Sequence, residues 1–541
     1  MKKKSVKILA LLLSLVFVMG TAAVPVSAAD EEVPEVSKIE KAFFDFTDDL
    51  VNGLVSAIAA IIPAPLEWIS EADYKSEYVP TGTEKFLDAP ATNAKWSLGY
   101  AQDSLLEGQN VLDKTHYVSG GIAVSPKYPE EIVDDSKVRV IAMNDGSGRG
   151  TVVFAVLDAY GLSNKDVREI RNRIDSFAQK NNIVSVNVAV LHQHSAVDTF
   201  GMNGDIIKAV FLNPAINLIN AMFNREVFRP FNGKNEIFQN NLFNVTVDTI
   251  ETAVAQMEPG KLMYGTVDVS EYLNDKRPPY ALQNTLNRFR FVPDDENSEE
   301  TWFSTSEIHC VGNGVQGTQI TADYPYYMEK YVNDVAGANF MLLMGAELAT
   351  GQRHEPFEKE IPEGMEGYMV LGEKLGERLV SITEEREVAP LLNITHKEVK
   401  FNIENQIILL AAKACLFENQ AVINGGDVKV VSEIGYMELG TDLAVALVPG
   451  EIEASIAFGG ALDKTNSWTG TDWIYDSMQK TVGDRELLVF GLCNDQVGYI
   501  VPTNDYMPML WEDSKSIEFV SLGSQTAVVY IGEFNELVKS K

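Results

Sequence analysis

A strand-helix-strand pattern between residues 151 and 194 is the clearest structural signal in the chain. Val152 to Leu157 is an uninterrupted apolar run, which is typical of a strand covered on both faces. Ser163 and Asp166 then have the spacing of a helix capping box. Apolar residues follow along one helical stripe, at Val167, Ile170, Ile174 and Phe177. Asn181-Asn182 ends the helix and a second strand follows, so we predict a β-α-β unit with neighbouring parallel strands.

The second strand is expected to bring two histidines to one edge of the sheet. Valine occupies alternate positions, and the alternation continues into a histidine pair, giving Val184, Val186, Val188, Val190, His192 and His194. Side chains two residues apart in a strand share a face, so both imidazoles should emerge together from the face that the valines bury. Asp158 ends the first strand of the same unit. Because ligands gather outside the carboxyl ends of strands in open α/β sheets, this edge is the expected place for chemistry.

Further strands are predicted in the last third of the chain. Lys429 to Leu439 and Leu443 to Val448 flank Gly440-Thr441-Asp442, a turn signal between two strands. Arg485 to Leu492 is another apolar strand, and a loop follows it from Asn494 to Tyr499. The predicted fold class is therefore α/β, with a mixed β-sheet, β-α-β units and a site at the carboxyl ends of strands.

The first 95 residues divide into two segments. Residues 1–29 have a basic start, a short apolar run and a small-residue cleavage site, which is the layout of a secretory signal peptide. An uncleaved membrane anchor is the alternative, disfavoured because the run is short. We expect a secreted, extracellular protein whose mature chain begins near Ala29 or Asp30. Residues 30–95 are acidic and then amphipathic, with a helical pattern from Phe43 to Ile62. This helix is expected to pack on the main domain, and contact with a lipid surface is the alternative.

Charge and cysteine content exclude several classes of function. A formal net charge of -33 argues against nucleic-acid binding, which needs clustered Lys and Arg, and against general attraction to anionic bilayers. The cysteines are Cys310, Cys415 and Cys493, without CxxC spacing, so neither a disulfide framework nor a thiolate zinc site is expected. Cys415 lies beside an apolar run and should be buried. One disulfide between two of the three stays open.

The pair His192 and His194 is the first candidate for chemistry. Neutral imidazoles are good zinc ligands, and a catalytic zinc takes about three protein ligands plus an open position. Such a pair can equally be a hydrogen-bonded structural element, and several kinds of zinc hydrolase share it. An ordinary zincin protease is disfavoured, because His354-Glu355 is followed by Pro356 instead of continuing as an HExxH helix.

Four short segments extend this candidate. They are VAVLHQHSAVDTF (188–200), FSTSEIHCVGNGVQGTQITADY (303–324), LVPGE (447–451) and NDQVGYIVPT (494–503). In this order they resemble the HTHS segment, the second histidine segment, the PGE turn and the Asn-x-Tyr-x-x-Tyr segment of the neutral/alkaline (non-lysosomal) ceramidases. The resemblance covers Trp96 to Tyr506 and implies that residues 96–541 form a ceramidase-like zinc hydrolase domain.

Carried over residue by residue, the resemblance implies a Zn²⁺ cofactor. Its implied ligands are His192, His309, Glu451 and Tyr499. His194 would hydrogen-bond the substrate carbonyl or a water at the zinc, and Arg277, in the stretch NDKRPPY, would bind the carbonyl. Asp158 is expected to orient a ligand imidazole. The implied reaction is hydrolysis of a lipid-like N-acyl amide, ceramide to sphingosine and fatty acid, with peripheral membrane contact and oligomeric state left open.

The resemblance has gaps. At residues 340–351 the family carries Asn-x-Gly-Asp-x-Ser, whose serine joins the amide cleavage, whereas this chain has FMLLMGAELATG. Glu347 and Thr350 are the nearest polar groups there. Gln496 replaces the first tyrosine of the last segment, Pro502-Thr503 replaces a Thr pair, and the family's C-terminal β-sandwich is expected to be absent. Two alternatives follow: a zinc hydrolase of another amide, ester or small peptide, and a non-catalytic secreted binding protein on the same scaffold.

Overall fold

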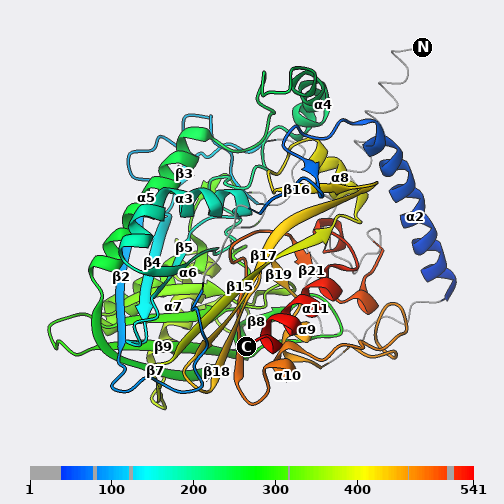
Figure 1. The fold of residues 1–541 in the computed structure, drawn as a ribbon. Coiled ribbons are helices and arrows are strands. Elements are labelled where there is room, and N and C mark those ends of the chain that lie inside the picture. The colour runs from blue at the N-terminus through cyan, green and yellow to red at the C-terminus, as the bar shows by residue number, and fades with distance from the viewer. Residues whose placement is uncertain are drawn as a thin grey trace, which may run out of the picture.

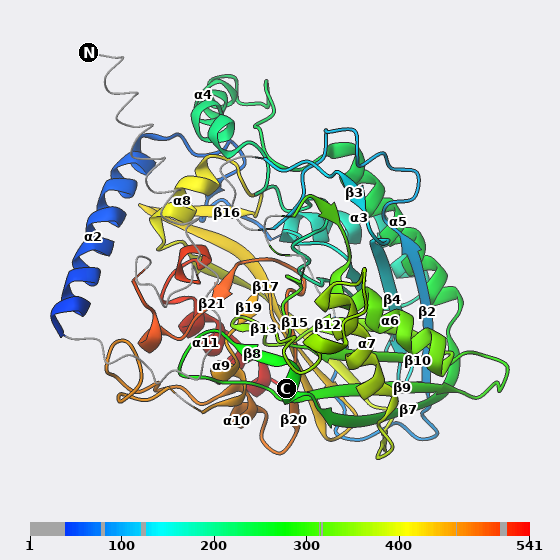
Figure 2. The same cartoon turned by 180° about the vertical axis from the view of Figure 1, so that it is seen from behind.

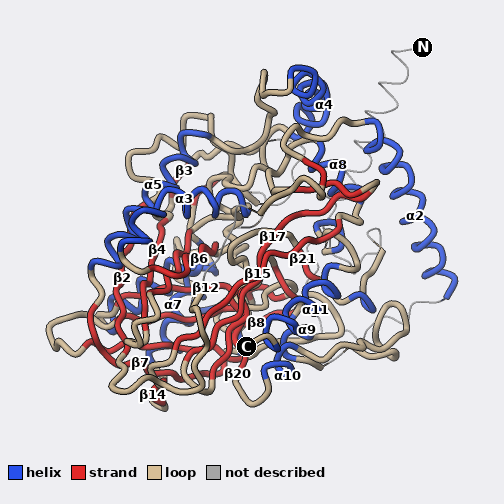
Figure 3. The backbone as a smooth tube through the Cα atoms, in the orientation of Figure 1, coloured by secondary structure: helices blue, strands red, loops and turns tan. Residues whose placement is uncertain are grey.

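The computed structural model describes residues 38–76, 82–120, 126–312, 314, 317–460, 462–508 and 517–541. Strands of two large sheets occupy the centre of the molecule and most helices lie at its periphery (Figures 1 and 3). The predicted signal peptide, residues 1–29, lies outside the described residues, so secretion stays a prediction.

The larger sheet has nine strands in the order β12-β10-β9-β7-β2-β4-β5-β6, with β14 beside β7. Its strands are β2 (Trp96–Ser104), β4 (Lys137–Asn144), β5 (Thr151–Leu157), β6 (Ile183–Val190), β7 (Glu258–Asp268), β9 (Thr285–Pro293), β10 (Thr301–Ser306), β12 (Asn339–Met344) and β14 (Arg386–Val388). Helix α5 (Glu236–Ala255) packs against β2 and β4 and touches α3 (Asn164–Lys180). Helices α6 (Asp323–Ala336) and α7 (Gly367–Val380) pack on each other and on β12, β7 and β9 (Figure 2).

The smaller sheet has six strands in the order β1-β16-β17-β18-β20, with β15 beside β17. Its strands are β1 (Ile69–Ser70), β15 (Leu392–Asn402), β16 (Ala421–Asn424), β17 (Asp427–Leu439), β18 (Leu443–Leu447) and β20 (Glu486–Phe490). Helix α11 (Thr526–Lys539) packs against β15 and β17. Three short ladders complete the set: β3 (Glu131–Ile132) with β11 (Gln319–Ile320), β8 (Leu273–Asp275) with β13 (Thr350–Gln352), and β19 (Glu451–Ile452) with β21 (Tyr499–Ile500).

The remaining helices lie outside the sheets. They are α2 (Lys38–Ile61), α4 (Ile206–Phe223), α8 (Gln406–Lys413), α9 (Ala454–Phe458), α10 (Met478–Val482) and the 3-10 turns η1 (Ser270–Tyr272), η2 (Glu358–Glu360), η3 (Thr503–Asp505) and η5 (Glu518–Val520). Helix α2 packs on α8, with Val55 and Ala59 buried, so the expected amphipathic helix does lie on the main domain. All three cysteines are buried and free, which answers the open question of a disulfide.

The predicted α/β class with a mixed sheet is confirmed. Strands β5 and β6 pair in parallel around α3. The capping box is present, because the Ser163 side chain accepts from the Asp166 backbone N–H and the Asp166 carboxylate accepts from the Ser163 backbone N–H at 2.9 Å. Strands β17 and β18 form the predicted antiparallel hairpin, and Gly440 at its turn has a φ of 67°.

The predicted course of the second strand is wrong at its end. Strand β6 stops at Val190, its last six residues are buried on both faces, and His192 has a φ of 53°, in the left-handed region. The histidine pair therefore lies on a turn after the strand, and strand alternation does not determine its direction.

Candidate metal centre

Backbone hydrogen bonds fix the turn that carries His192 and His194. The backbone N–H of Gln193 donates to the Ala159 carbonyl at 3.1 Å, and that of His194 donates to the Cys310 carbonyl at 3.1 Å. The Gln193 side chain donates to the Asp158 carboxylate at 2.9 Å and to the Ala322 carbonyl at 2.8 Å. The middle residue of the motif therefore holds the loop while its neighbours present their imidazoles.

Three imidazoles meet at this turn. One ring nitrogen each from His192, His194 and His309 lies within 4.8 Å of the other two, and all three side chains are buried. His309 reaches the group because its backbone N–H donates to the Thr350 carbonyl at 3.0 Å, which ties the loop after β10 to β13. Neither ring nitrogen of His194 has a hydrogen-bond partner, although both are buried. Buried polar atoms without partners are rare, and here they point to a bound group that supplies one.

Glu451 faces the other two imidazoles. Its Oε1 lies 3.5 Å from Nε2 of His192, and its Oε2 lies 2.9 Å from Nε2 of His309. The Nδ1 atoms of His192 and His309 point instead at the carbonyls of Tyr160 and Glu347, at 2.8 and 3.0 Å. A carbonyl only accepts, so each Nδ1 carries a proton, and in the neutral tautomer the Nε2 lone pair faces the carboxylate. In that tautomer three acceptors face one another, and a metal cation between them would satisfy all three.

Glu451 and Tyr499 are neighbours because β19 and β21 pair in parallel with these two residues in register. Gln496 donates to Glu451 Oε1 at 3.3 Å, and the rings of Tyr499 and His309 lie 6.4 Å apart. A Cβ at Gly450 would come within 2.5 Å of the Gly498 carbonyl, so the Pro-Gly-Glu turn needs its glycine for this close approach. The structure thus brings together the four predicted ligands, and the ring of His194 lies beside them.

The protonation states suit a cation. Burial lowers the pKa of His192, and burial together with the two neighbouring imidazoles lowers the pKa of His194 well below its usual value. Burial acts to raise the pKa of Glu451, but His192 and His309 outweigh it and the net pKa is lowered. Burial, followed by Glu451, raises the pKa of Tyr499 well above that of a free phenol. These shifts favour the neutral imidazole at His192 and His194 and the carboxylate at Glu451, the forms that bind metal.

Asp158 lies beside the turn but away from the ring nitrogens that it was expected to orient. Its carboxylate accepts from Arg139 Nη1 at 2.9 Å, from the Lys137 backbone N–H at 2.8 Å and from the Gln193 side chain. The carbonyls of Tyr160 and Glu347 make the orienting hydrogen bonds instead. Asp158 acts on the histidine pair only through Gln193.

Arg277 is held by acidic partners. Its Nη1 lies 2.7 Å from Glu518 and its Nη2 lies 3.2 Å from the Asp505 carboxylate, with all three side chains almost fully buried. Its own backbone N–H donates to Asp275 at 2.9 Å. These contacts tie β8 to the segment that follows Tyr499. The guanidinium that was expected to bind a substrate carbonyl is therefore already paired with two carboxylates.

Two further residues of the centre were missed or left unassigned by the sequence reasoning. The ring of Tyr160 stacks on His192 at 4.5 Å and meets His194 edge-on at 5.1 Å. Its place just after a strand end was the available signal. Glu347, from the stretch that departs from the ceramidase pattern, is fully buried, and neither carboxylate oxygen has a hydrogen-bond partner. Burial, then Glu451 and Glu307, raises its pKa well above the usual value.

An apolar cavity of about 70 Å³ opens beside the centre. Glu451, Tyr499 and Gln496 supply its polar end. The remaining wall is mostly apolar and includes Trp68, Phe200, Ile408, Phe417 and Leu522. A molecule with a hydrocarbon chain next to a polar bond matches this lining.

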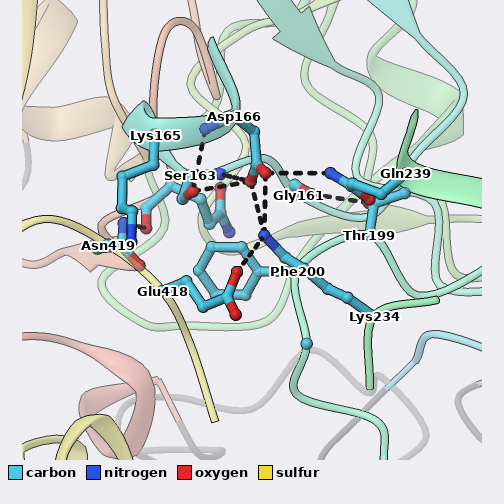
Figure 4. Close-up of polar contacts among 12 residues, drawn as sticks. Gly161, Ser163, Lys165, Asp166, Thr199, Phe200, Lys234, Gln239, Glu418 and Asn419 are labelled. Atoms are coloured by element: carbon cyan, nitrogen blue, oxygen red, sulfur yellow. Dashed lines mark hydrogen bonds and ion pairs between the residues drawn. The ribbon is translucent and has the colours of Figure 1, made fainter. Parts of the chain in front are cut away.

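A buried polar network (Figure 4) lies behind the cavity wall. It supports Phe200 and Phe417, whose ring centroids lie 5.9 Å apart. Lys234 lies at its centre, with Nζ 2.8 Å from Asp166 and 3.3 Å from Glu418. Thr199, next to Phe200, donates to the Gly161 carbonyl at 2.7 Å. The network links the start of α3 to both sides of the cavity wall.

We expect Lys234→Met to lower the free energy of unfolding by about 3–5 kcal/mol, because it leaves the Asp166 and Glu418 carboxylates facing each other without a cation. Chemical denaturation would measure the change. Lys165→Met is the matched control, since Lys165 pairs with Glu67 at the surface and should change stability by less than about 1 kcal/mol. Equal effects of the two substitutions would show that the network does not stabilise the wall.

Comparisons with known proteins identify the fold of the chain. No family model matches the chain, and no curated protein matches it. Among solved structures, the neutral ceramidase from Pseudomonas aeruginosa matches with a TM-score of 0.60 and 14% identity, over 83% of this chain and 74% of that one. A ceramidase complexed with C2 matches with a TM-score of 0.60 and 13% identity, over 82% and 75% of the two chains. The chain therefore has a neutral ceramidase-like fold.

Proposed function

We propose that this chain is a secreted, zinc-dependent amidohydrolase that cleaves a lipid-like N-acyl amide, with ceramide as the substrate and sphingosine and fatty acid as products. The observation that carries the proposal is the approach of two imidazole Nε2 atoms to the Glu451 carboxylate, at 3.5 and 2.9 Å, beside an apolar cavity. The ceramidase-like fold supports the same substrate class.

The donor set fits zinc. His192, His309, Glu451 and Tyr499 would hold the ion, and two imidazoles, one carboxylate and one phenol oxygen suit a borderline metal. Zinc, when bound, supplies a water of lowered pKa and polarises a carbonyl. The carbonyls of Tyr160 and Glu347 keep the two imidazoles in the tautomer that leaves Nε2 free.

The other residues position the substrate. His194 has two ring nitrogens without a partner, so one is available to donate to the carbonyl oxygen of the amide. The resemblance implies that Arg277 binds the same carbonyl, whereas its ion pairs with Asp505 and Glu518 favour a different task, which is to fix the segment after Tyr499. Asp158 holds the histidine pair through Gln193.

Peripheral contact with a lipid surface is part of the proposal. Helix α2 buries one face on α8, and its other face exposes large apolar side chains. These exposed residues are Phe43, Phe46, Leu50, Leu54 and Ile61. An amphipathic helix of this kind can lie at the interface of a bilayer.

The test is release of fatty acid from ceramide by the purified, zinc-loaded protein. We expect turnover that is lost after chelation, restored by zinc and absent in His192→Ala. A panel of other acyl amides, esters and small peptides should be turned over more slowly. Zinc-dependent turnover of the panel without turnover of ceramide would contradict the proposed substrate. The proposal that the protein is a zinc-dependent hydrolase would still stand.

A non-catalytic binding protein is the second candidate. The observation that favours it is the stretch from Phe340 to Gly351, where Glu347 stands in a segment that lacks the family's serine. Full zinc occupancy without turnover of any member of the panel would support this candidate against the first.

A further inference from the structure

Helix α4 exposes large apolar side chains although half of its buried residues are polar. Three of its six buried residues are asparagines, Asn213, Asn217 and Asn220, and the other three, near its start, are apolar. Its outer face is apolar and consists of Ile207, Phe211, Leu212, Leu218, Met222 and Phe223, which are 39–73% exposed. A helix on the surface of a soluble domain normally buries its apolar side, so the outer face of α4 calls for a partner.

The asparagines fix this orientation. Asn213 donates to the carbonyls of Phe231 and Ala414 at 2.8 and 2.6 Å and accepts from the Phe231 backbone N–H. Asn217 donates to the Lys413 carbonyl at 2.9 Å. Asn220 accepts from the backbone N–H groups of Val227 and Phe228.

Rotation of α4 to bury its outer face would leave these amides and carbonyls without partners. The apolar side chains are therefore held outward by the fold.

We propose that the outer face of α4 docks on the surface of a lipid bilayer with electrically neutral headgroups. Among the described residues, α4 is the helix that is long and apolar enough to cross a membrane, with one third of its length buried. Its asparagine contacts hold it against α8 and the loop to Phe231, so it can enter a bilayer only by lying in the interface.

The charge of the protein favours a neutral bilayer over the other possible partners of this face. Lys208 is the single charged residue within α4, and its Nζ lies 3.9 Å from the centre of the Phe231 ring. The net charge of -33 makes two copies of the chain repel each other and disfavours anionic headgroups, whereas a neutral bilayer meets neither obstacle.

The position of α4 connects this surface to the cavity. Helices α2, α4 and α8 share one apolar cluster, and Ile408 and Ala412 of α8 line the cavity that ends at Glu451. Phe200 and Met202, shortly before α4, line it too. Figures 1 and 2 show α4 projecting from the molecule next to α8 and the upper end of α2. If the proposed function holds, docking would place the cavity near a lipid substrate.

Flotation with phosphatidylcholine vesicles that contain no ceramide tests the inference. The purified protein should float with the vesicles, and Leu218→Glu combined with Met222→Glu should lower its partition coefficient about tenfold or more. These side chains are 52% and 73% exposed, so the melting temperature should not change. Val335→Glu combined with Ile474→Glu is the matched control, at 55% and 80% exposure on α6 and on the loop before α10, and should bind as the parent does.

Three results would overturn the inference: no flotation of the parent protein, flotation that the α4 substitutions leave unchanged, or flotation only with anionic phosphatidylglycerol vesicles. A dimer in solution that the same substitutions dissociate, without vesicle binding, would assign the face to a second copy. The assay needs no turnover, so a protein that floats but hydrolyses no amide would contradict the proposed function alone.

Discussion

Replacing Glu451 by glutamine is expected to remove bound zinc and to lower amide hydrolysis by about a thousandfold or more. Glu451 is the carboxylate that approaches Nε2 of both His192 and His309, so it supplies the negative charge that a dication needs. A glutamine keeps the shape but removes the charge, and its NH₂ group would compete for the same lone pairs. Metal analysis after dialysis and the initial rate of fatty-acid release would measure the two effects.

Glu453→Gln is the matched control. Glu453 lies two residues further along, is also buried, and accepts from Ser455 at the start of α9. A glutamine oxygen can accept the same hydrogen bond, so this variant should keep about one zinc per chain. If Glu451→Gln binds zinc normally, Glu451 is not a ligand and the metal lies elsewhere. If both variants lose zinc equally, the loss is not specific to Glu451 and the assignment of this ligand fails.

The sequence pattern was sufficient to predict those elements that depend on interactions between residues close together in the chain. The apolar run of β5, the capping box of α3 and the glycine turn between β17 and β18 each depend on residues close in sequence. The strand order of the larger sheet, in which β2 lies between β7 and β4, depends on contacts between distant segments and left no periodic signal. The end of β6 was misplaced because alternation cannot reveal a left-handed residue such as His192.

The candidate site was predictable where a short motif carried it. His192, His309, Glu451 and Tyr499 were chosen from four separate segments, and the fold brings them together. The partners of Asp158 and Arg277 could not be foreseen, since Arg139 and Glu518 lie in segments without any motif. The apolar outer face of α4 was missed because composition shows asparagine and leucine without showing which side packs.

The second large effect is expected at Glu347, where stability and activity should change in opposite directions. Glu347 is fully buried with no hydrogen-bond partner for its carboxyl group, which is an arrangement that destabilises a fold by roughly 1–3 kcal/mol. A residue kept at such a cost beside Glu451 indicates a functional role. We expect Glu347→Met to raise the melting temperature by about 2–4 °C and to lower hydrolysis about a hundredfold.

The stabilisation should depend on pH. Burial, then Glu451 and Glu307, raises the folded-state pKa of Glu347 above that of an unfolded glutamate, about 4.3. The folded carboxyl therefore binds its proton more tightly than the unfolded one. The contribution of Glu347 to the stability of the parent protein therefore falls as the pH rises above the pKa of the unfolded glutamate. It stops falling when the pH exceeds the pKa of the folded group. The gain in melting temperature of Glu347→Met over the parent should therefore be small near pH 4 and grow towards neutrality.

Calorimetry across this pH range, with zinc analysis of each sample, separates a functional carboxyl from a structural one. Glu347→Gln, which keeps the shape and most polar contacts, should retain zinc and gain less stability than the methionine variant, yet lose activity to a similar degree. Both variants should retain the metal, because the Glu347 contact with His309 is made by the backbone carbonyl. A methionine variant that is less stable and fully active would show that Glu347 only fills space in the fold.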